Sequence, residues 1–213
     1  MNTSLIRTLV FVGTEGIYHD HPGTGRFLTQ IIEEETSVSA EFSQDYDILS
    51  KNLQKFDTVL FYTDIGSLTE PQENGLLNFI QGGGGFFGLH TASASFLKNP
   101  RYHKMLNGYF DGHSDYMDFE VSIVDRNHPI TESMEKFSIK DELHYFSHDK
   151  TLSHRLMEAY DPGKKKKYAM ALHHMYGKGR VFYFALGHDN ACHSNPNFKT
   201  VLKRGILWTA KKI

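Results

Sequence analysis

The sequence predicts an α/β protein with a doubly wound, mostly parallel sheet and added antiparallel edge strands in its second half. Short apolar runs at 9–12, 57–63 ("DTVLFYT") and 86–89 ("FFGL") have the length and composition of buried parallel strands. Segments with apolar residues at helical spacing separate them, and this alternation is typical of a doubly wound sheet. After residue 116 apolar and polar residues alternate, which favours antiparallel or edge strands.

The first half shows where each helix begins and ends. Residues 25–35 are expected to form a helix, 38–42 a strand, and "ILSKNLQKF" a short amphipathic helix. Thr69 caps a further helix, Pro71 lies near its first turn, and the glycines at 82–85 end it. Ligand sites in such sheets lie beyond the carboxyl ends of the strands. We therefore expect the loops at 14–21, 64–68 and 90–95 along one edge.

The second half supplies more strands and one long helix. Asn195 caps that last helix, with Pro196 at its first position. The basic run 164–167 follows Asp-Pro-Gly and indicates a solvated turn between two strands, with a phosphate-binding patch as the alternative. The expected strands are "YMDFEVSIVDRNHPIT", "FSIKDELHYF", "HRLMEAY", "YAMALHHMY" and "GRVFYFALG".

Composition bounds the function classes. The 213 residues suit one domain over 1–213, and a net charge of -2 argues against a nucleic-acid binder. Cys192 is the only cysteine, so the chain has neither an intramolecular disulfide nor a cysteine-based zinc site. The N-terminal apolar run is too short for a signal sequence or a membrane span. We expect a cytoplasmic protein with no membrane partner, and the sequence leaves a homodimer open.

Thirteen histidines stand out, and His90 in "GGGGFFGLHTASASF" stands out among them. It lies where a strand must turn sharply into a helix, beside small residues such as Gly88, Ala92 and Ser93. The helix N-terminus should lower the pKa of this imidazole and keep it neutral, ready to donate one hydrogen bond and accept another. We expect an exposed catalytic side chain here; the alternative is a histidine that only caps the turn.

Several blocks together resemble the trehalose-utilisation (ThuA-like) family: the elbow block above, "GYFDGHSDY", "NHPIT", "KDELHYF", "GKGRVFYFALGHD" and "GILWTA". The resemblance runs from about residue 8 to about residue 210. It implies a single ThuA-like domain with a flavodoxin-like fold related to class I glutamine amidotransferases. Those enzymes carry a cysteine at the elbow. His90 takes that place here, so thiol-based amide hydrolysis is not expected.

The family motifs transfer to particular residues of this chain. They imply catalytic roles for His90 in "GLH", Asp141 and Glu142 in "DEL", and His188 in "GHD". The family block around His113 often has Pro where this chain has Ser114. Contacts to the substrate are expected from His19, His113 and Asp189, and the aromatic rings of Tyr18 and Tyr145 are suited to stacking on a sugar.

The function that the family implies is carbohydrate catabolism, on a keto disaccharide or keto glycoside. Isomerase, lyase or hydrolase chemistry beside a ketone needs a base and a group that holds the developing oxyanion. The alternative is a sugar-binding or regulatory module without catalysis. A serine hydrolase using Ser93 or Ser95 is disfavoured, because neither lies in a Gly-x-Ser-x-Gly frame.

Two further expectations concern the site. His19, His90, His113, Glu142 and His188 are candidate ligands of a divalent metal, and imidazole with carboxylate suits Zn²⁺, Mn²⁺, Fe²⁺ or Ni²⁺. His90 and His188 should share one pocket with Asp141 and Glu142, less than about 12 Å apart, if the strands before the two histidines are parallel neighbours. Cys192, in a polar segment, is expected to be dispensable.

Overall fold

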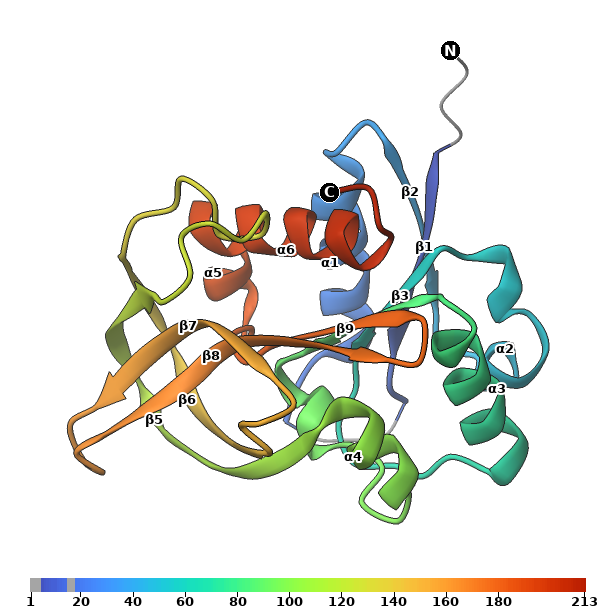
Figure 1. Cartoon of the computed structure of the whole chain (residues 1–213), viewed down its shortest axis with the longest axis horizontal. Coiled ribbons are helices and arrows are strands. Elements are labelled where there is room, and N and C mark those ends of the chain that lie inside the picture. The colour runs from blue at the N-terminus through green and yellow to red at the C-terminus, as the bar shows by residue number, and fades with distance from the viewer. Residues whose placement is uncertain (1–4, 15–17) are drawn as a thin grey trace.

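A nine-stranded sheet organises the computed structural model, which describes residues 5–14 and 18–213 (Figure 1). The strand order is β2-β1-β3-β4-β9-β8-β7-β5-β6. Four neighbouring pairs run parallel and four antiparallel, so the α/β class is confirmed and the sheet is mixed. The strands are β1 (Ile6–Val12), β2 (Val38–Ser43), β3 (Thr58–Tyr62), β4 (Gly85–Leu89), β5 (Gly108–Ile123), β6 (Phe137–His148), β7 (His154–Asp161), β8 (Lys166–Tyr176) and β9 (Gly179–Phe184).

The parallel part of the sheet is buried on both faces by helices. The core strands β1, β3 and β4 are apolar and almost wholly buried, as expected when both faces are covered. Helices α1 and α6 contact one another and one face, and α3 contacts both α2 and α4 on the other side (Figure 1). The helical segments are α1 (His21–Glu33), α2 (Ile48–Lys51), η1 (Leu53–Lys55), α3 (Glu70–Gln81), η2 (His90–Ala94), α4 (Pro100–Leu106), α5 (Asn190–His193) and α6 (Pro196–Thr209).

The helix boundaries follow the expected capping residues. The Thr69 hydroxyl and the Gln72 side chain form a capping box at the start of α3, and Gly82 ends that helix. The Asn195 side chain accepts hydrogen bonds from the first turn of α6. The short helices α4 and α5 were not expected, because neither is long enough to show a helical period. Pro100 at the start of α4 was the available signal.

The strand that precedes His90 is a parallel neighbour of the strand that precedes His188. Phe86 pairs with Val181 and Leu89 with Phe184 across β4 and β9. The topological expectation is therefore confirmed, and both following loops open on the same edge of the sheet.

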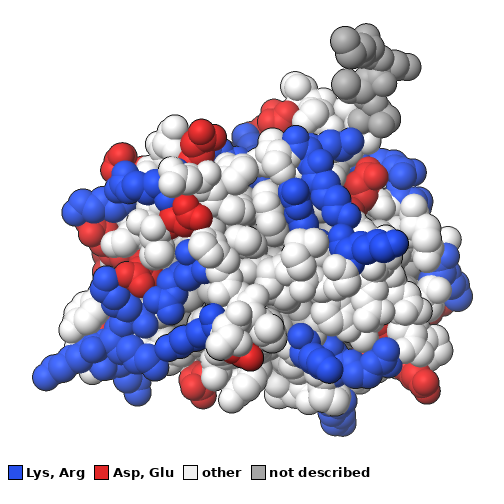
Figure 2. All heavy atoms as spheres, in the orientation of Figure 1, with Lys and Arg blue, Asp and Glu red and all other residues white. Residues whose placement is uncertain are grey.

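The surface charge is dispersed. Lys and Arg side chains gather over the free end of the β7–β8 hairpin, where residues 162–165 form an exposed turn and Lys166 and Lys167 begin β8 (Figure 2). This agrees with the solvated turn expected from the sequence. Within residues 5–14 and 18–213, no helix is both long and apolar enough to cross a membrane.

Candidate functional site

His90 sits at a strained elbow immediately after β4. Its φ of 47° is a left-handed conformation that non-glycine residues rarely adopt, and such strain is often retained at functional sites. The ring Nδ1 donates to the Ala185 carbonyl at 2.8 Å, and the Tyr183 hydroxyl donates to the His90 carbonyl at 3.0 Å. These bonds fix both the backbone and the imidazole tautomer.

The side chain of His90 is fully buried, which corrects the expectation of an exposed elbow. The elbow is covered by β6, whose His144 ring stacks on His90 with centroids 3.8 Å apart. Burial, with the neighbouring imidazoles of His144 and His19, holds the pKa of His90 well below its usual value. His90 is therefore neutral, as the elbow argument predicted, although the cause is burial rather than the helix terminus.

His188 shares the pocket with His90. It follows β9 after Gly187, whose φ of 132° is open to glycine but not to other residues without strain. The centroids of the His90 and His188 rings are 5.8 Å apart, so the shared-pocket prediction is confirmed for this pair.

Glu142 reaches the same pocket from β6. Its Oε2 lies 3.2 Å from His188 Nδ1 and 3.7 Å from His144 Nε2. Burial raises the pKa of Glu142, but the imidazoles of His144 and His188 outweigh that effect and hold the pKa well below normal. Contact with Glu142 in turn raises the pKa of His188, against the effect of burial. Glu142 is thus a carboxylate at neutral pH.

His19 enters from the loop after β1 and is held by a carboxylate from the loop after β3. His19 Nδ1 lies 3.2 Å from Asp64 Oδ2, and His21 Nε2 lies 3.2 Å from Asp64 Oδ1. The His19 ring is 5.5 Å from that of His90 and 5.1 Å from that of His188. Three loops that the sequence placed along one edge therefore meet at this site.

Asp141 lies behind the pocket rather than in it. Its buried carboxylate accepts hydrogen bonds from the backbone N–H groups of Glu142, Gly187 and His188 and from the Cys192 thiol. Burial raises the pKa of Asp141 to about 6, and these donors oppose that rise. Its position does not support the direct catalytic role expected for it. It braces the segments that carry Glu142 and His188.

Strand alternation explains why Tyr145 is not at the site. Successive side chains of β6 point to opposite faces, so Glu142 and His144 share the pocket face and Tyr145 faces away. Its hydroxyl donates to Asp161 and its ring stacks on Tyr168 with centroids 4.3 Å apart. Tyr145, expected to bind substrate, therefore does not line the cavity that Glu142 and His144 line.

The other predicted contact residues surround the pocket. His113 lines it, with Nδ1 3.7 Å from Glu142 Oε1, and Tyr18 lines its mouth and is 72% exposed. Asp189 lies beside it: it caps α5 and accepts a hydrogen bond of 2.7 Å from the Tyr116 hydroxyl, whose ring is 5.4 Å from that of His188.

A cavity of about 520 Å³ lies here, and its wall includes His19, His113, Glu142 and His188. The sequence patterns did not single out several other lining residues, including Asp64, Thr91 and His144. For His144, the period of two from Glu142 along β6 was an available signal. A buried polar atom without a hydrogen-bond partner in the described chain needs an explanation, and a bound ligand is one. Such atoms around the cavity are His19 Nε2, His21 Nε2, Asp64 Oδ1, His90 Nε2, Thr91 Oγ1, His144 Nδ1 and His188 Nδ1. Among them, His21 Nε2 and Asp64 Oδ1 face each other, and His188 Nδ1 faces Glu142, each as an ion pair at 3.2 Å.

Three of these histidines have the arrangement of a metal-ligand set. One ligand atom from each of His19, His90 and His188 lies within 4.8 Å of the others. In His19 and His90, Nδ1 faces an oxygen acceptor, which leaves the unpartnered Nε2 as the atom free to bind a cation. Metal-binding histidines commonly have such an outer acceptor. The residues therefore fit a divalent cation of the kind that imidazole prefers.

The model of one protein family, described as trehalose utilisation, matches residues 7–209. The chain belongs to the trehalose utilisation (ThuA) family. No curated protein sequence matches it. Two ThuA-like crystal structures share its fold: one from Parabacteroides merdae (20% identity, TM-score 0.88, covering 97% of this chain and 90% of that one) and one from Bacteroides uniformis (13%, 0.83, 98% and 93%). A glutamine amidotransferase from Thermotoga maritima is similar at 12% identity and TM-score 0.58, covering 98% of this chain and 99% of that one.

In this ThuA-family chain the nearby serine and cysteine side chains already serve the fold. The Ser93 hydroxyl is hydrogen-bonded to Tyr183, and that of Ser95 donates to the Thr63 carbonyl. Cys192 is buried in α5 rather than placed in a polar loop, and burial raises the pKa of its thiol well above normal. A raised pKa disfavours the thiolate, so the Cys192 thiol is not an activated nucleophile.

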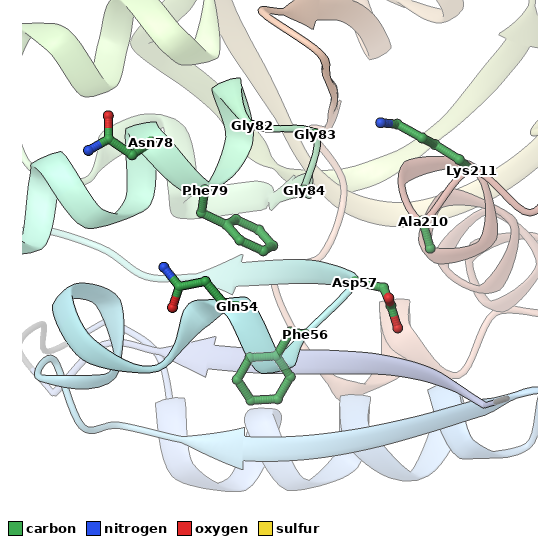
Figure 3. A pocket seen from close by; sticks show the side chains of 10 residues that line it. All are labelled: Gln54, Phe56, Asp57, Asn78, Phe79, Gly82, Gly83, Gly84, Ala210 and Lys211. Carbon is green, nitrogen blue, oxygen red and sulfur yellow. The ribbon is translucent and has the colours of Figure 1, made fainter.

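A second hollow, of about 510 Å³, lies at the opposite, amino edge of the sheet of the ThuA-family chain (Figure 3). Glycines 82–84, Phe56 and Phe79 form much of its wall. Its charged groups have partners: Asp57 accepts from the Arg7 N–H, and Lys211 donates to the Lys178 carbonyl. The two hollows have similar volumes, but the buried polar atoms without hydrogen-bond partners named above lie around the first one.

Proposed function

We propose that this ThuA-family chain is an enzyme of carbohydrate utilisation that acts beside the ketone of a keto disaccharide or keto glycoside. The family supports a role in carbohydrate utilisation. The observation that carries the chemistry is the convergence of unpartnered imidazole nitrogens with an ionised carboxylate in one cavity. Such a site can hold an electrophile and a base at the same carbon.

His19, His90 and His188 are the proposed holders of a divalent cation. When bound, the cation would polarise the ketone oxygen and stabilise the enediolate. Asp64 orients His19, and the Ala185 carbonyl orients His90. The cavity walls then position the sugar so that its reacting carbon faces Glu142.

Glu142 is the proposed base. Its carboxylate is ionised at neutral pH and lies on the cavity wall, where it accepts the proton from the carbon next to the ketone. His113, with a side chain that is 46% exposed, lies beside Glu142, where the cavity is open to solvent. Return of the proton to a neighbouring carbon gives isomerisation, and loss of a leaving group gives elimination.

The chain is not proposed to hydrolyse glutamine. His90 occupies the elbow where the amidotransferases place a cysteine, and Cys192 is buried against Asp141. The alternative function is a sugar-binding or regulatory module on the same scaffold, because the cavity could bind a ligand without converting it.

The test is turnover of 3-keto glucosides and 3-keto disaccharides, followed by NMR on untagged protein. We expect conversion that a chelator abolishes and that Zn²⁺, Mn²⁺, Fe²⁺ or Ni²⁺ restores. Metal content below about a tenth of an equivalent, with no activation by any of these ions, would contradict the cation. Binding without conversion under all these conditions would support the non-catalytic alternative.

A further inference from the structure

The cavity has two zones of different chemistry. Its floor carries His19, His144, His188, Glu142 and Asp64, which are buried or half-buried. Its rim carries Tyr18, Ile65, Ala94 and Phe110, which are partly or largely exposed and, apart from the tyrosine hydroxyl, apolar. A ligand that fills the cavity therefore meets polar groups at one end and apolar surface at the other.

Ile65 is the most unusual residue of the rim. Its φ of 53° is an outlier for a β-branched side chain, and the side chain is 47% exposed. The conformation is held by its backbone: the Ile65 carbonyl accepts a hydrogen bond of 2.8 Å from Phe96, and Ile65 pairs with Ser95 in an isolated bridge. An isoleucine there is both strained and exposed to water. A ligand that covers it accounts for an apolar side chain at this position.

The floor offers hydrogen-bond partners for the hydroxyls of one sugar, and the rim offers few for a second sugar. The Thr91 hydroxyl is buried, unpartnered and lines the cavity, so it can bind a hydroxyl of the sugar next to the histidines. A second sugar ring at the rim would find no hydrogen-bond partner on the side chains of Ile65, Ala94 and Phe110. An aromatic ring would instead remove their apolar surface from water.

We propose that the rim is a subsite for an aromatic aglycone, so that the preferred substrate is a keto glycoside of an aromatic alcohol rather than a keto disaccharide. Ile65 and Tyr18 would pack against the ring, and Thr91 would bind the sugar. This proposal rests on the proposed function only in assuming that a sugar binds at the floor of the cavity. The selectivity of the rim is a binding property that does not require turnover.

The experiment compares the affinities of three unoxidised ligands: phenyl glucoside, methyl glucoside and trehalose. We expect the phenyl glucoside, in its better anomer, to bind about tenfold more tightly than the other two, because its ring removes apolar surface of the rim from water. The variant Ile65→Asn should reduce this preference to less than about twofold, since asparagine tolerates the left-handed backbone but presents a polar side chain. Leu97→Asn is the matched control: Leu97 is apolar and 73% exposed but does not line the cavity, so the preference should remain.

Equal affinity for phenyl and methyl glucosides, or trehalose binding as tightly as the phenyl glucoside, would overturn the proposal. So would a folded Ile65→Asn protein that keeps the preference, or no binding of any ligand up to about 10 mM. A phenyl preference that is lost in Ile65→Asn, in a protein that converts no keto sugar, would leave the aglycone subsite standing and remove only the proposed enzymatic activity.

Discussion

Two clusters of histidines lie within residues 5–14 and 18–213, and they differ in whether they have the features of a reaction site. The pocket cluster comprises His19, His90, His144 and His188, and the distal cluster comprises His128, His154 and His173. Both contain stacked imidazoles, with centroids 3.8 Å apart for His90 and His144 and 4.5 Å for His128 and His173. In both, burial lowers the pKa of a stacked ring.

The difference lies in what surrounds the rings. His173 packs against Trp208 with centroids 4.8 Å apart, and His154 Nε2 is 2.8 Å from Asp125 Oδ2. His173 Nε2 is also unpartnered, but none of the candidate metal-ligand groups in the described chain includes it. In the pocket cluster, several free nitrogens converge on a cavity with carboxylates. Burial and stacking alone therefore do not identify a functional histidine; convergence of free ligand atoms does.

The largest expected effect separates the clusters directly. His90→Asn removes the central imidazole, and asparagine tolerates the left-handed backbone at that position. We expect turnover to fall by about a thousandfold and cation affinity by at least about tenfold, while the fold persists. The matched variant His173→Asn should retain both within about twofold, because His173 does not line the cavity. Kinetics on keto glycosides and cation titrations provide the measurements.

Full activity in a folded His90→Asn protein would leave His90 as a structural elbow residue. Equal losses in the two variants would mean that the clusters act through stability, and circular dichroism with thermal unfolding would reveal it.

The clusters also show how far the sequence could be interpreted. The elbow, and the neighbourhood of His90 and His188, followed from local signals: an apolar run, a glycine and a strand order that parallel packing favours. His19 came from the family resemblance. Asp64 was placed only as part of a loop, because its role depends on where β3 lies beside β1. Tyr145 and Asp141 were expected at the site but do not line the cavity, because a motif such as "KDELHYF" does not say which strand face points to it.

A second comparison concerns the carboxylate behind each cluster. Asp64 faces His19 Nδ1, as Asp125 faces His154 Nε2. In Asp64→Asn the amide can donate to Nδ1, which would move the proton to Nε2 and block that atom as a ligand. We expect cation affinity to fall by about ten- to a hundredfold, with a smaller loss of turnover. Asp125→Asn should change neither, since His154 has a side chain that is 55% exposed and lies outside the pocket.

Cation titration by calorimetry measures this effect. An Asp64→Asn protein with unchanged cation affinity would show that His19 Nε2 is not a ligand of the cation.

The smallest expected effect is on stability, and it comes from the distal cluster. Burial, followed by the neighbouring imidazoles, lowers the pKa of His173 to about 3, below its ordinary value of 6.5. The unfolded chain therefore binds a proton in this range that the folded chain does not. Stability is full above pH 6.5 and falls as the pH drops toward 3. We expect His173 to contribute a loss of about 1 to 2 kcal/mol in the free energy of unfolding between pH 7 and pH 5. The other groups whose charges act on His173 are His128, His154, His174 and Asp125.

Urea unfolding of the original protein and of His173→Asn, at pH 7 and pH 5, isolates the contribution of His173, because the buried imidazoles of the pocket cluster contribute equally to both proteins. Between pH 7 and pH 5, the free energy of unfolding of the variant should fall by about 1 to 2 kcal/mol less than that of the original protein. The same slope in both proteins would show that His173 is protonated in the folded chain without penalty. The distal cluster would then be open to water, and its contrast with the pocket cluster would rest on ligand geometry alone.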